Sequence, residues 1–298
     1  MPRPRVGVLG ATSFIGEFLF ADLAAAENPI VAFSRQLFKS DPPEAEWVQI
    51  PDNLATVTVA GEIPFWVSLI PIWLLPQYFS LFHRLGIKRL VALSSTSRFT
   101  KVDSLYAEER ALAQRLADAE ESILGWGQNN GIQVVILQAT MIYAAGRDEN
   151  VSSIARFICK FGFFPVLGSA HGLRQPVHAQ DVAFACHAAL IKPQLQSSYI
   201  LSGGETFSYR DMIRRIFLSL NKPVRIMTCP LWIFKVGVFA ARFLGKKISY
   251  GIAERMNQNL AFDHKDATNS LDFMPRKFEL QEFETSGHRC PVNNNKAT

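Results

Sequence analysis

The segment Val6–Gly16, with the sequence VGVLGATSFIG, constrains the fold of this chain more than any other stretch. It places the short apolar run Val6–Leu9 directly before a turn of small residues, and a helical pattern, Phe14–Ala26, follows the turn. Gly10 lets the backbone turn tightly, and Gly16 lets the new helix pack close to the strand. The N–H groups at the start of such a helix attract an anion. The segment therefore predicts a strand, turn and helix that hold the pyrophosphate of a dinucleotide.

The spacing of this turn departs from the usual G-x-x-G-x-x-G, because Ser13 stands where the middle glycine is expected. The strand before the turn and the helix after it supply the context that supports the motif. An ordinary strand-to-helix connection without a ligand is the alternative. We expect the cofactor contacts to come from this turn and from the end of the second strand, at Gly10, Thr12, Ser13, Phe14, Ile15, Gly16, Ser34 and Arg35.

The end of the second expected strand, Ile30–Ser34, bears on the choice of cofactor. Folds that select NAD usually place an acidic side chain there for the ribose 2′-hydroxyl, whereas an arginine accommodates a 2′-phosphate. Arg35 follows this strand directly. It therefore favours NADP, with NAD as the second choice. A solvated arginine at the start of a loop is the other interpretation.

Strand and helix patterns alternate through the first half of the chain. Such alternation predicts an α/β fold of the Rossmann type, with a doubly wound parallel sheet and helices on both faces. A ligand would then lie at the carboxyl ends of the strands. The expected elements are the strands Val6–Leu9, Ile30–Ser34, Trp47–Ile50, Phe65–Ile70, Leu90–Leu93 and Gln133–Gln138, and the helices Phe14–Ala26, Pro76–Leu85, Asp103–Asn129 and Val151–Phe161.

The regular alternation loosens after Tyr143, which suggests a second, smaller lobe. We expect residues 1–145 to form the dinucleotide-binding lobe, completed by strands from about 171–202. Residues 146–170 and 203–285 would form the C-terminal substrate lobe, and 286–298 a flexible tail.

Composition excludes several classes of function. The 298 residues are 48% hydrophobic, enough for a large α/β core, and the net charge of +5 comes from scattered basic residues, which argues against nucleic acid as a partner. The four cysteines have no C-x-x-C spacing, and the histidines do not cluster with them, so neither a disulfide framework nor a metal site is indicated. No apolar signal core precedes the first strand. These features favour a cytoplasmic protein.

Two apolar stretches raise the question of a membrane. Residues 63–82 carry no charge and are long enough to span a bilayer, but prolines at positions 64, 71 and 76 divide them. A buried strand followed by a helix is the favoured interpretation, and we expect no transmembrane span. The second stretch, Pro230–Leu244, fits either the buried face of a helix or a face that lies on a membrane surface.

Four segments in order resemble the extended short-chain dehydrogenases/reductases, in the NAD-dependent epimerase/dehydratase family. The similarity covers most of residues 5–280. It implies that the first lobe binds NAD(P) and that the second binds a nucleotide sugar. The implied function is that of an oxidoreductase or epimerase acting on a nucleotide-linked sugar or a similar hydroxyl or keto substrate. The segments are GATSFIG (10–16), LSSTSRF (93–99), VVILQATMIY (134–143) and GLRQPVHAQDVAFA (172–185).

The resemblance also implies catalytic positions. Family members carry a serine or threonine after the fifth strand that bonds the substrate oxygen, and Thr96 matches it; capping of the next helix is the alternative. The family's Tyr-x-x-x-Lys pair moves the proton, because the lysine lowers the pKa of the tyrosine. Here Tyr106 and Arg110 have this spacing. The family positions themselves fall near residues 112–113 and 116–117, which are apolar, two helical turns or about 10 Å further on.

In the second lobe the resemblance makes Arg174 the partner of the substrate diphosphate, a task that suits a guanidinium because it pairs with two oxygens at once. Arg147 and Asn150 lie where the family's cleft closes, although a solvated loop explains them equally well. Loss of the Tyr/Lys pair supports an alternative function, a catalytically eroded dinucleotide-binding assembly or regulatory protein that could associate with a membrane surface. A homodimer is left open.

Overall fold

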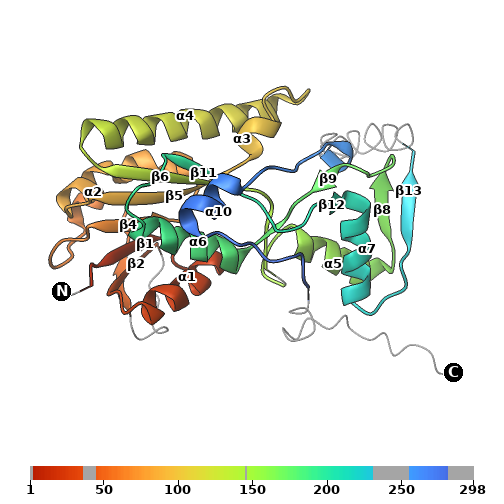
Figure 1. Ribbon diagram of the computed structural model, residues 1–298, viewed down its shortest axis with the longest axis horizontal. Coiled ribbons are helices and arrows are strands. Elements are labelled where there is room, and N and C mark those ends of the chain that lie inside the picture. The colour runs from red at the N-terminus through yellow and green to blue at the C-terminus, as the bar shows by residue number, and fades with distance from the viewer. Residues whose placement is uncertain (1–2, 36–44, 145, 231–254, 281–298) are drawn as a thin grey trace. The chain divides into compact units, whose positions relative to one another are not determined.

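The computed structural model describes residues 3–35, 45–144, 146–230 and 255–280 (Figure 1). The chain divides into two compact units, and the first takes up the whole N-terminal half together with two later segments. The second of these segments, Asp263–Pro275, was expected in the C-terminal lobe. The first unit consists of Met1–Thr140, Ala179–Ser202 and Asp263–Pro275, and the second of Met141–His178, Gly203–Phe262 and Arg276–Thr298.

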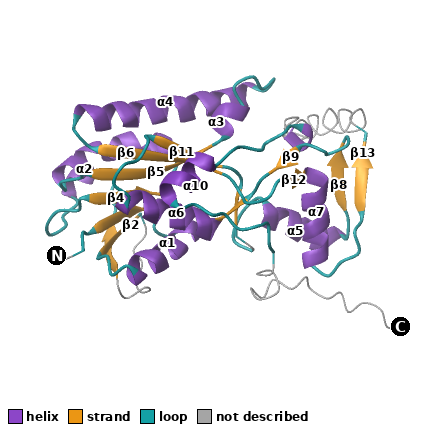
Figure 2. Cartoon of the chain, viewed as in Figure 1, coloured by secondary structure: helices purple, strands orange, loops and turns teal. Residues whose placement is uncertain are grey.

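A seven-stranded sheet forms the centre of the first unit, and all of its strand pairs are parallel (Figure 2). The strand order is β11-β6-β5-β4-β1-β2-β3, so the direction of winding reverses between β1 and β4. This confirms the α/β Rossmann-type prediction. The strands are β1 (Val6–Leu9), β2 (Ile30–Ser34), β3 (Ala45–Gln49), β4 (Phe65–Ser68), β5 (Arg89–Ser95), β6 (Gln133–Ala139) and β11 (Ser198–Leu201).

Helices cover both faces of the sheet (Figure 1). Trp66 lies at the centre of the core on one face, with its ring 4.8 Å from that of Phe33 and 4.7 Å from that of Phe82. That face carries the 3-10 helix η2 (Ile72–Tyr78) and the helices α2 (Phe79–Arg84) and α4 (Ala107–Asn129), and the other carries α1 (Phe14–Ala25) and α6 (Ala179–Ile191). The short elements η1 (Leu54–Thr56), α3 (Ser97–Thr100) and α10 (Lys265–Leu271) complete the unit.

The uncharged run 63–82 forms β4, η2 and α2. The helix expected from Pro76 is divided, because a proline inside η2 has no N–H to donate. Within the described ranges, the structure contains no helix with both the length and the apolar character needed to cross a bilayer. Most of the Pro230–Leu244 segment lies outside the described residues.

The second unit has its own hydrophobic core, in which Tyr143, Ile213 and Phe217 are fully buried. Among the described residues of this unit, three two-stranded sheets and two helices contribute to it. The helices are α5 (Val151–Phe161) and α7 (Tyr209–Ser219), and the strand pairs are β7 (Ile142–Tyr143) with β10 (Val177–His178), β8 (Phe164–Leu167) with β13 (Ile226–Cys229), and β9 (Leu173–Arg174) with β12 (Phe207–Ser208).

The sequence analysis indicated no disulfide framework, but one cysteine departs from this expectation. Cys186 and Cys229 carry free thiols, but Cys159 is disulfide-bonded, which the spacing did not indicate. Among the described residues no group of three or more potential metal ligands comes together.

Candidate functional site: a dinucleotide turn at the sheet edge

The backbone of the turn after β1 requires glycine at two positions, Gly10 and Gly16. Gly10 has a φ of +76°, and a Cβ atom there would lie 3.1 Å from both Cγ2 and the main-chain nitrogen of Ile70. A Cβ atom at Gly16 would clash with the carbonyl oxygen of Ala11. The chain can therefore fold in this way only if both side chains are absent.

Ser13 takes the place of the missing glycine without strain, because its backbone is extended, with φ −73° and ψ 156°. It is the N-cap of α1: its hydroxyl accepts the N–H of Gly16 at 3.2 Å, and its own N–H donates to the oxygen of Gly10 at 3.0 Å. The first N–H groups of a helix have no partner inside the helix. Within the described part of the chain those of Phe14 and Ile15 find no other acceptor, so they are available to an anion.

The turn lies where the strand order reverses, which is the ligand site of open α/β sheets. On the neighbouring strand, Ser68 is paired in register with Leu9, and the N–H of Leu69 donates to the oxygen of Leu9 at 2.9 Å. The hydroxyl of Ser68 is completely buried and has no hydrogen-bond partner in the described structure. A bound ligand or water is the usual partner of such a group. The turn and its surroundings therefore fit a dinucleotide.

Arg35 is exposed at the carboxyl end of β2, which lies beside β1 in the sheet. The side chain of Ser34 before it is buried. Burial raises the pKa of Tyr78, and the positive charge of Arg35 partly offsets this rise. Thr12 is exposed in the turn. The expected cofactor residues thus gather at one edge of the sheet.

Thr96 follows β5 and is buried. Its N–H donates to the oxygen of Ala139 at 3.0 Å, and its hydroxyl contacts the same oxygen at 3.3 Å. Its own carbonyl accepts the N–H groups of Phe99 and Thr100, which opens α3. In this arrangement the hydroxyl of Thr96 ties the ends of two strands together, and it would have to rotate to donate to a substrate.

The expected helix Asp103–Asn129 would have contained Tyr106, but in the structure this residue lies just before the helix. It is the N-cap residue of α4, which begins at Ala107, and its N–H donates to the hydroxyl of Ser104 at 3.2 Å. Arg110 donates to the carbonyl oxygen of Ser104 at 2.6 Å. The helix starts later than expected because Ser104 gathers these polar contacts in the preceding loop.

The helix positions at which the family carries its tyrosine and lysine are part of the core. Ala113 and Leu116 are buried, and Leu112 packs against the hydrophobic cluster around Trp66. These side chains fill the space between α4 and the sheet. They offer no group that could hold or move a proton.

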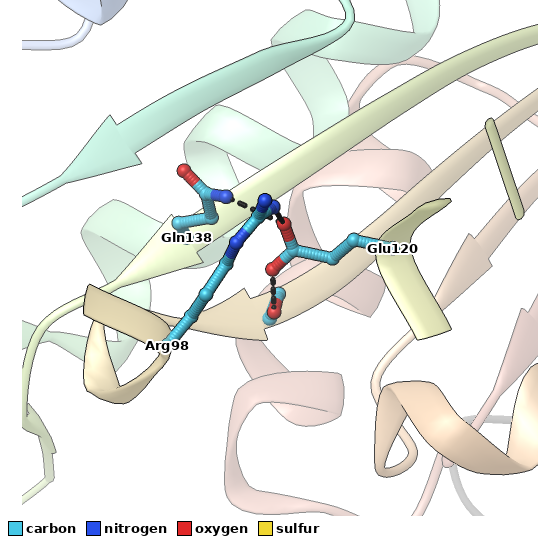
Figure 3. A network of polar contacts seen from close by, with 4 residues as sticks. Arg98, Glu120 and Gln138 are labelled. Atoms are coloured by element: carbon cyan, nitrogen blue, oxygen red, sulfur yellow. Dashed lines mark hydrogen bonds and ion pairs between the residues drawn. The ribbon is translucent and has the colours of Figure 1, made fainter. Parts of the chain in front are cut away.

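One turn further along the same helix, the structure shows a polar cluster that the sequence analysis missed (Figure 3). The carboxylate of Glu120 is almost fully buried and forms an ion pair with Arg98. It also accepts the hydroxyl of Ser94 at 2.5 Å and the amide of Gln138 at 2.7 Å. The available signal was a glutamate at a position where the helical pattern calls for an apolar residue.

In the second unit, Arg174 is buried and its guanidinium bonds to main-chain carbonyl oxygens. It donates to Leu173 at 2.7 Å and to Gln258 at 2.8 Å, and a further bond goes to the oxygen of Arg255. The guanidinium also lies 5.1 Å from the centre of the Tyr209 ring. Burial lowers the pKa of Arg174 to about 10. These partners hold the guanidinium in place without neutralising its charge.

Arg147 and Asn150 are exposed on either side of the buried Asp148. The Asp148 carboxylate accepts the N–H of Asn150 at 2.8 Å, the N–H of Val151 at 2.6 Å and the hydroxyl of Ser152 at 2.8 Å. Asp148 therefore closes the N-terminus of α5 and orders the loop. The sequence analysis missed it, although a carboxylate just before an apolar helix is a capping signal.

No protein-family model matches the chain. It is 21% identical over 221 residues to UDP-glucose 4-epimerase from Vibrio cholerae, which covers 71% of this chain and 66% of that protein. It is 26% identical over 207 residues to NADH dehydrogenase [ubiquinone] 1 alpha subcomplex subunit 9, mitochondrial, from Arabidopsis thaliana, covering 68% of this chain and 48% of that protein. The matched regions thus span about two thirds and about half of the lengths of these relatives.

Solved structures share the fold over nearly the whole chain. UDP-N-acetylglucosamine 4-epimerase from Bacillus cereus has a TM-score of 0.70, with 14% identity and 96% of each chain covered. UDP-glucuronic acid 4-epimerase from Bacillus cereus, in complex with NAD, has a TM-score of 0.68, with 15% identity and 93% of each chain covered. RMD from Pseudomonas aeruginosa, complexed with NADPH, has a TM-score of 0.64, with 15% identity and coverage of 94% and 95%.

The sheet order and the turn after β1 define an α/β fold of the Rossmann type. In sequence the chain is similar to an epimerase, and it shares its fold with solved epimerase structures.

Proposed function

We propose that this protein binds a nicotinamide dinucleotide, NADP in preference to NAD, and acts as an oxidoreductase or epimerase on a nucleotide-linked sugar or a similar hydroxyl or keto substrate. The observation that carries the proposal is the turn at residues 10–16, with its two required glycines, at the point where the strand order reverses. Similar structures hold NAD and NADPH, which supports the cofactor class.

The residues of the turn have distinct tasks in this proposal. The N–H groups of Phe14 and Ile15 bind the pyrophosphate, while Ser13 caps the helix and keeps these groups in place. Arg35 pairs with the 2′-phosphate that distinguishes NADP from NAD. The dinucleotide, when bound, accepts or supplies the hydride.

Proton transfer and substrate binding are assigned to the remaining candidates. The hydroxyl of Thr96 bonds the substrate oxygen once it turns from the carbonyl of Ala139, and the phenol of Tyr106 moves the proton with Arg110 as the nearby positive charge. Arg174, whose charge is not neutralised, is the residue for the substrate diphosphate, with Arg147 and Asn150 at the same lobe's exposed loop.

Calorimetry with NADPH and NADH, followed by turnover assays with UDP-glucose and dTDP-glucose, tests the proposal. We expect binding of NADPH. We also expect a rise in absorbance when a nucleotide sugar reduces NADP+, a fall when its keto form oxidises NADPH, or, for an epimerase, the epimeric sugar as product with no net change in the dinucleotide. Absence of dinucleotide binding to the folded protein would reject the function altogether.

A second candidate function is a binding protein that keeps the dinucleotide as a structural ligand. The apolar α4 face at Leu112 and Leu116 favours it, since the usual proton-transfer pair is missing there. The similarity to a subunit of an NADH dehydrogenase points in the same direction.

Replacement of Tyr106 by phenylalanine separates the two functions. The change removes only the phenolic oxygen, so in an enzyme that uses it we expect a loss in kcat of about 100-fold with unchanged dinucleotide affinity. Unchanged turnover would exclude Tyr106 as the acid or base. If NADPH binds and no substrate is turned over, the binding protein becomes the better account.

A further inference from the structure

The carboxylate of Glu120 is charged and buried on a helix face that is otherwise apolar. Its side chain is 1% exposed, and Leu116 and Ile123 on the same face belong to the hydrophobic core. Removing an ion pair from water costs several kcal/mol per ion, and an apolar pair of similar volume often stabilises a fold equally well. Stability alone therefore does not explain why α4 carries a glutamate here.

The partners of Glu120 all come from the carboxyl edge of the sheet. Ser94 and Gln138 are the second-last residues of β5 and β6, and they are paired with each other in register. Arg98 belongs to α3, the single helical turn that follows Thr96. The four side chains thus join two strand ends, α3 and α4 around one carboxylate (Figure 3).

Arg98 is the link between this cluster and the surface. Its side chain is 34% exposed, and its guanidinium has one nitrogen on Glu120 and its centre 5.5 Å from the Phe99 ring. The ion pair ties this single helical turn to Glu120 of α4. Loss of the pair would remove this tie from the turn that begins at Thr96.

This turn lies on the same edge of the sheet as the dinucleotide turn. Two strand spacings separate β5 from β1, about 10 Å in all. A dinucleotide whose pyrophosphate sits at residues 10–16 extends to both sides of it along this edge. One half lies toward β2 and Arg35, and the other toward the end of β5.

We propose that Glu120 and Arg98 are positioning residues for the nicotinamide half of the bound dinucleotide: the buried carboxylate fixes Arg98, and Arg98 fixes the turn from Thr96 to Thr100 against which that half lies. This inference rests on the proposed function. It adds a role for the polar cluster around Glu120, which would position one half of the cofactor.

The test compares NADPH with 2′-phospho-ADP-ribose, which lacks the nicotinamide ring. In the double variant Arg98→Met with Glu120→Leu an apolar pair replaces the ion pair, which avoids leaving a lone buried charge. We expect at least a tenfold loss in affinity for NADPH in calorimetry, and an affinity for 2′-phospho-ADP-ribose within twofold of the unmodified protein. The matched control is Gln114→Met with Asp118→Leu, an exposed bonded pair on the same helix, which should leave both affinities unchanged.

A single variant covers the case in which the double variant does not fold. Glu120→Gln removes the ion pair without leaving a lone buried charge and should weaken NADPH alone, whereas Arg98→Lys keeps an ion pair and should retain most of the NADPH affinity. Equal changes for both ligands, or no change for NADPH, would overturn the inference while the proposed function stands. Failure of the unmodified protein to bind either ligand would overturn both.

Discussion

Gly10 and Ser13 belong to the same turn after β1, and each suits the backbone conformation at its own position in a different way. Gly10 has a positive φ, and backbone atoms of Leu69 and Ile70, which follow β4, lie 3.1 Å from where its Cβ would be, so no other residue fits. Ser13 has an ordinary extended backbone and contributes a cap instead. The incomplete glycine motif is therefore compatible with an intact turn.

Replacement of Gly10 by valine should destabilise the fold and abolish dinucleotide binding. A left-handed backbone costs a residue with a Cβ about 1–2 kcal/mol, before the contact with Ile70 is added. Urea denaturation and calorimetry with NADPH measure the two effects. Gly125→Ala in α4 is the control, because a Cβ there meets nothing within 4 Å; it should raise stability by about 0.5–1 kcal/mol. Wild-type binding by the valine variant would place the cofactor elsewhere.

Arg35 is the residue on which the proposed preference for NADP depends. We expect Arg35→Ala to bring the affinities for NADPH and NADH together, with a loss of about 1–3 kcal/mol for NADPH, the usual contribution of a hydrogen bond to a charged group. Arg115→Ala, an arginine on α4 that lies over Trp73, serves as a control for the change in net charge. Equal affinities for the two dinucleotides in the unmodified protein would refute the assignment.

At the scale of elements, α5 depends on a cap that precedes its nominal first turn. The buried carboxylate of Asp148 accepts four main-chain N–H groups and the hydroxyl of Ser152. Arg147 and Asn150 lie in the loop that this cap orders. Their proposed contact with substrate therefore relies on Asp148.

Asp148→Ala should lower the free energy of unfolding by about 2 kcal/mol, the upper range for loss of an N-cap, because buried N–H groups lose their acceptor. Chemical denaturation measures this loss. The exposed neighbour Glu149 provides the comparison, since its replacement by alanine should change stability by less than about 0.5 kcal/mol. Similar effects of the two variants would mean that the cap contributes little.

The ion pair between Glu205 and Arg215 joins α7 to the segment before β12, with two bonds of 2.7 Å. The Arg215 guanidinium holds the pKa of Glu205 below its ordinary value of 4.5. The folded state therefore binds the proton more weakly than the unfolded state. The stabilisation is present above pH 4.5 and is lost as the pH falls through the lower pKa of the folded protein.

Glu205→Gln should accordingly lower stability at pH 7 by about 0.5–1 kcal/mol, a modest value because both side chains are partly exposed. The difference from the unmodified protein should shrink toward pH 3. Denaturation curves across this pH range measure it. A difference that stays constant with pH would show that the charge of Glu205 plays no part.

At the scale of the whole molecule, the first unit is built from three separate segments of the chain, so the dinucleotide lobe folds only after distant parts have come together. A ligand that binds only the folded lobe stabilises all of these segments. NADPH at 100 times its Kd should add about 2.7 kcal/mol to the free energy of unfolding and raise Tm. The Gly10→Val variant should show no such rise. An equal rise in that variant would indicate binding away from the turn.

Local patterns in the sequence were enough to predict the strand, turn and helix that begin at Val6 and the parallel sheet. Each depends on residues close together in the chain or on a period of apolar residues, and the structure confirms the parallel sheet. Only the tertiary structure decided the environment of Glu120, because Ser94 and Gln138 are 26 and 18 residues away from it. The same holds for Arg174, whose carbonyl partner in Gln258 lies 84 residues further on. The spacing of residues along the chain does not predict such contacts, since they form only when distant segments pack together and exclude water.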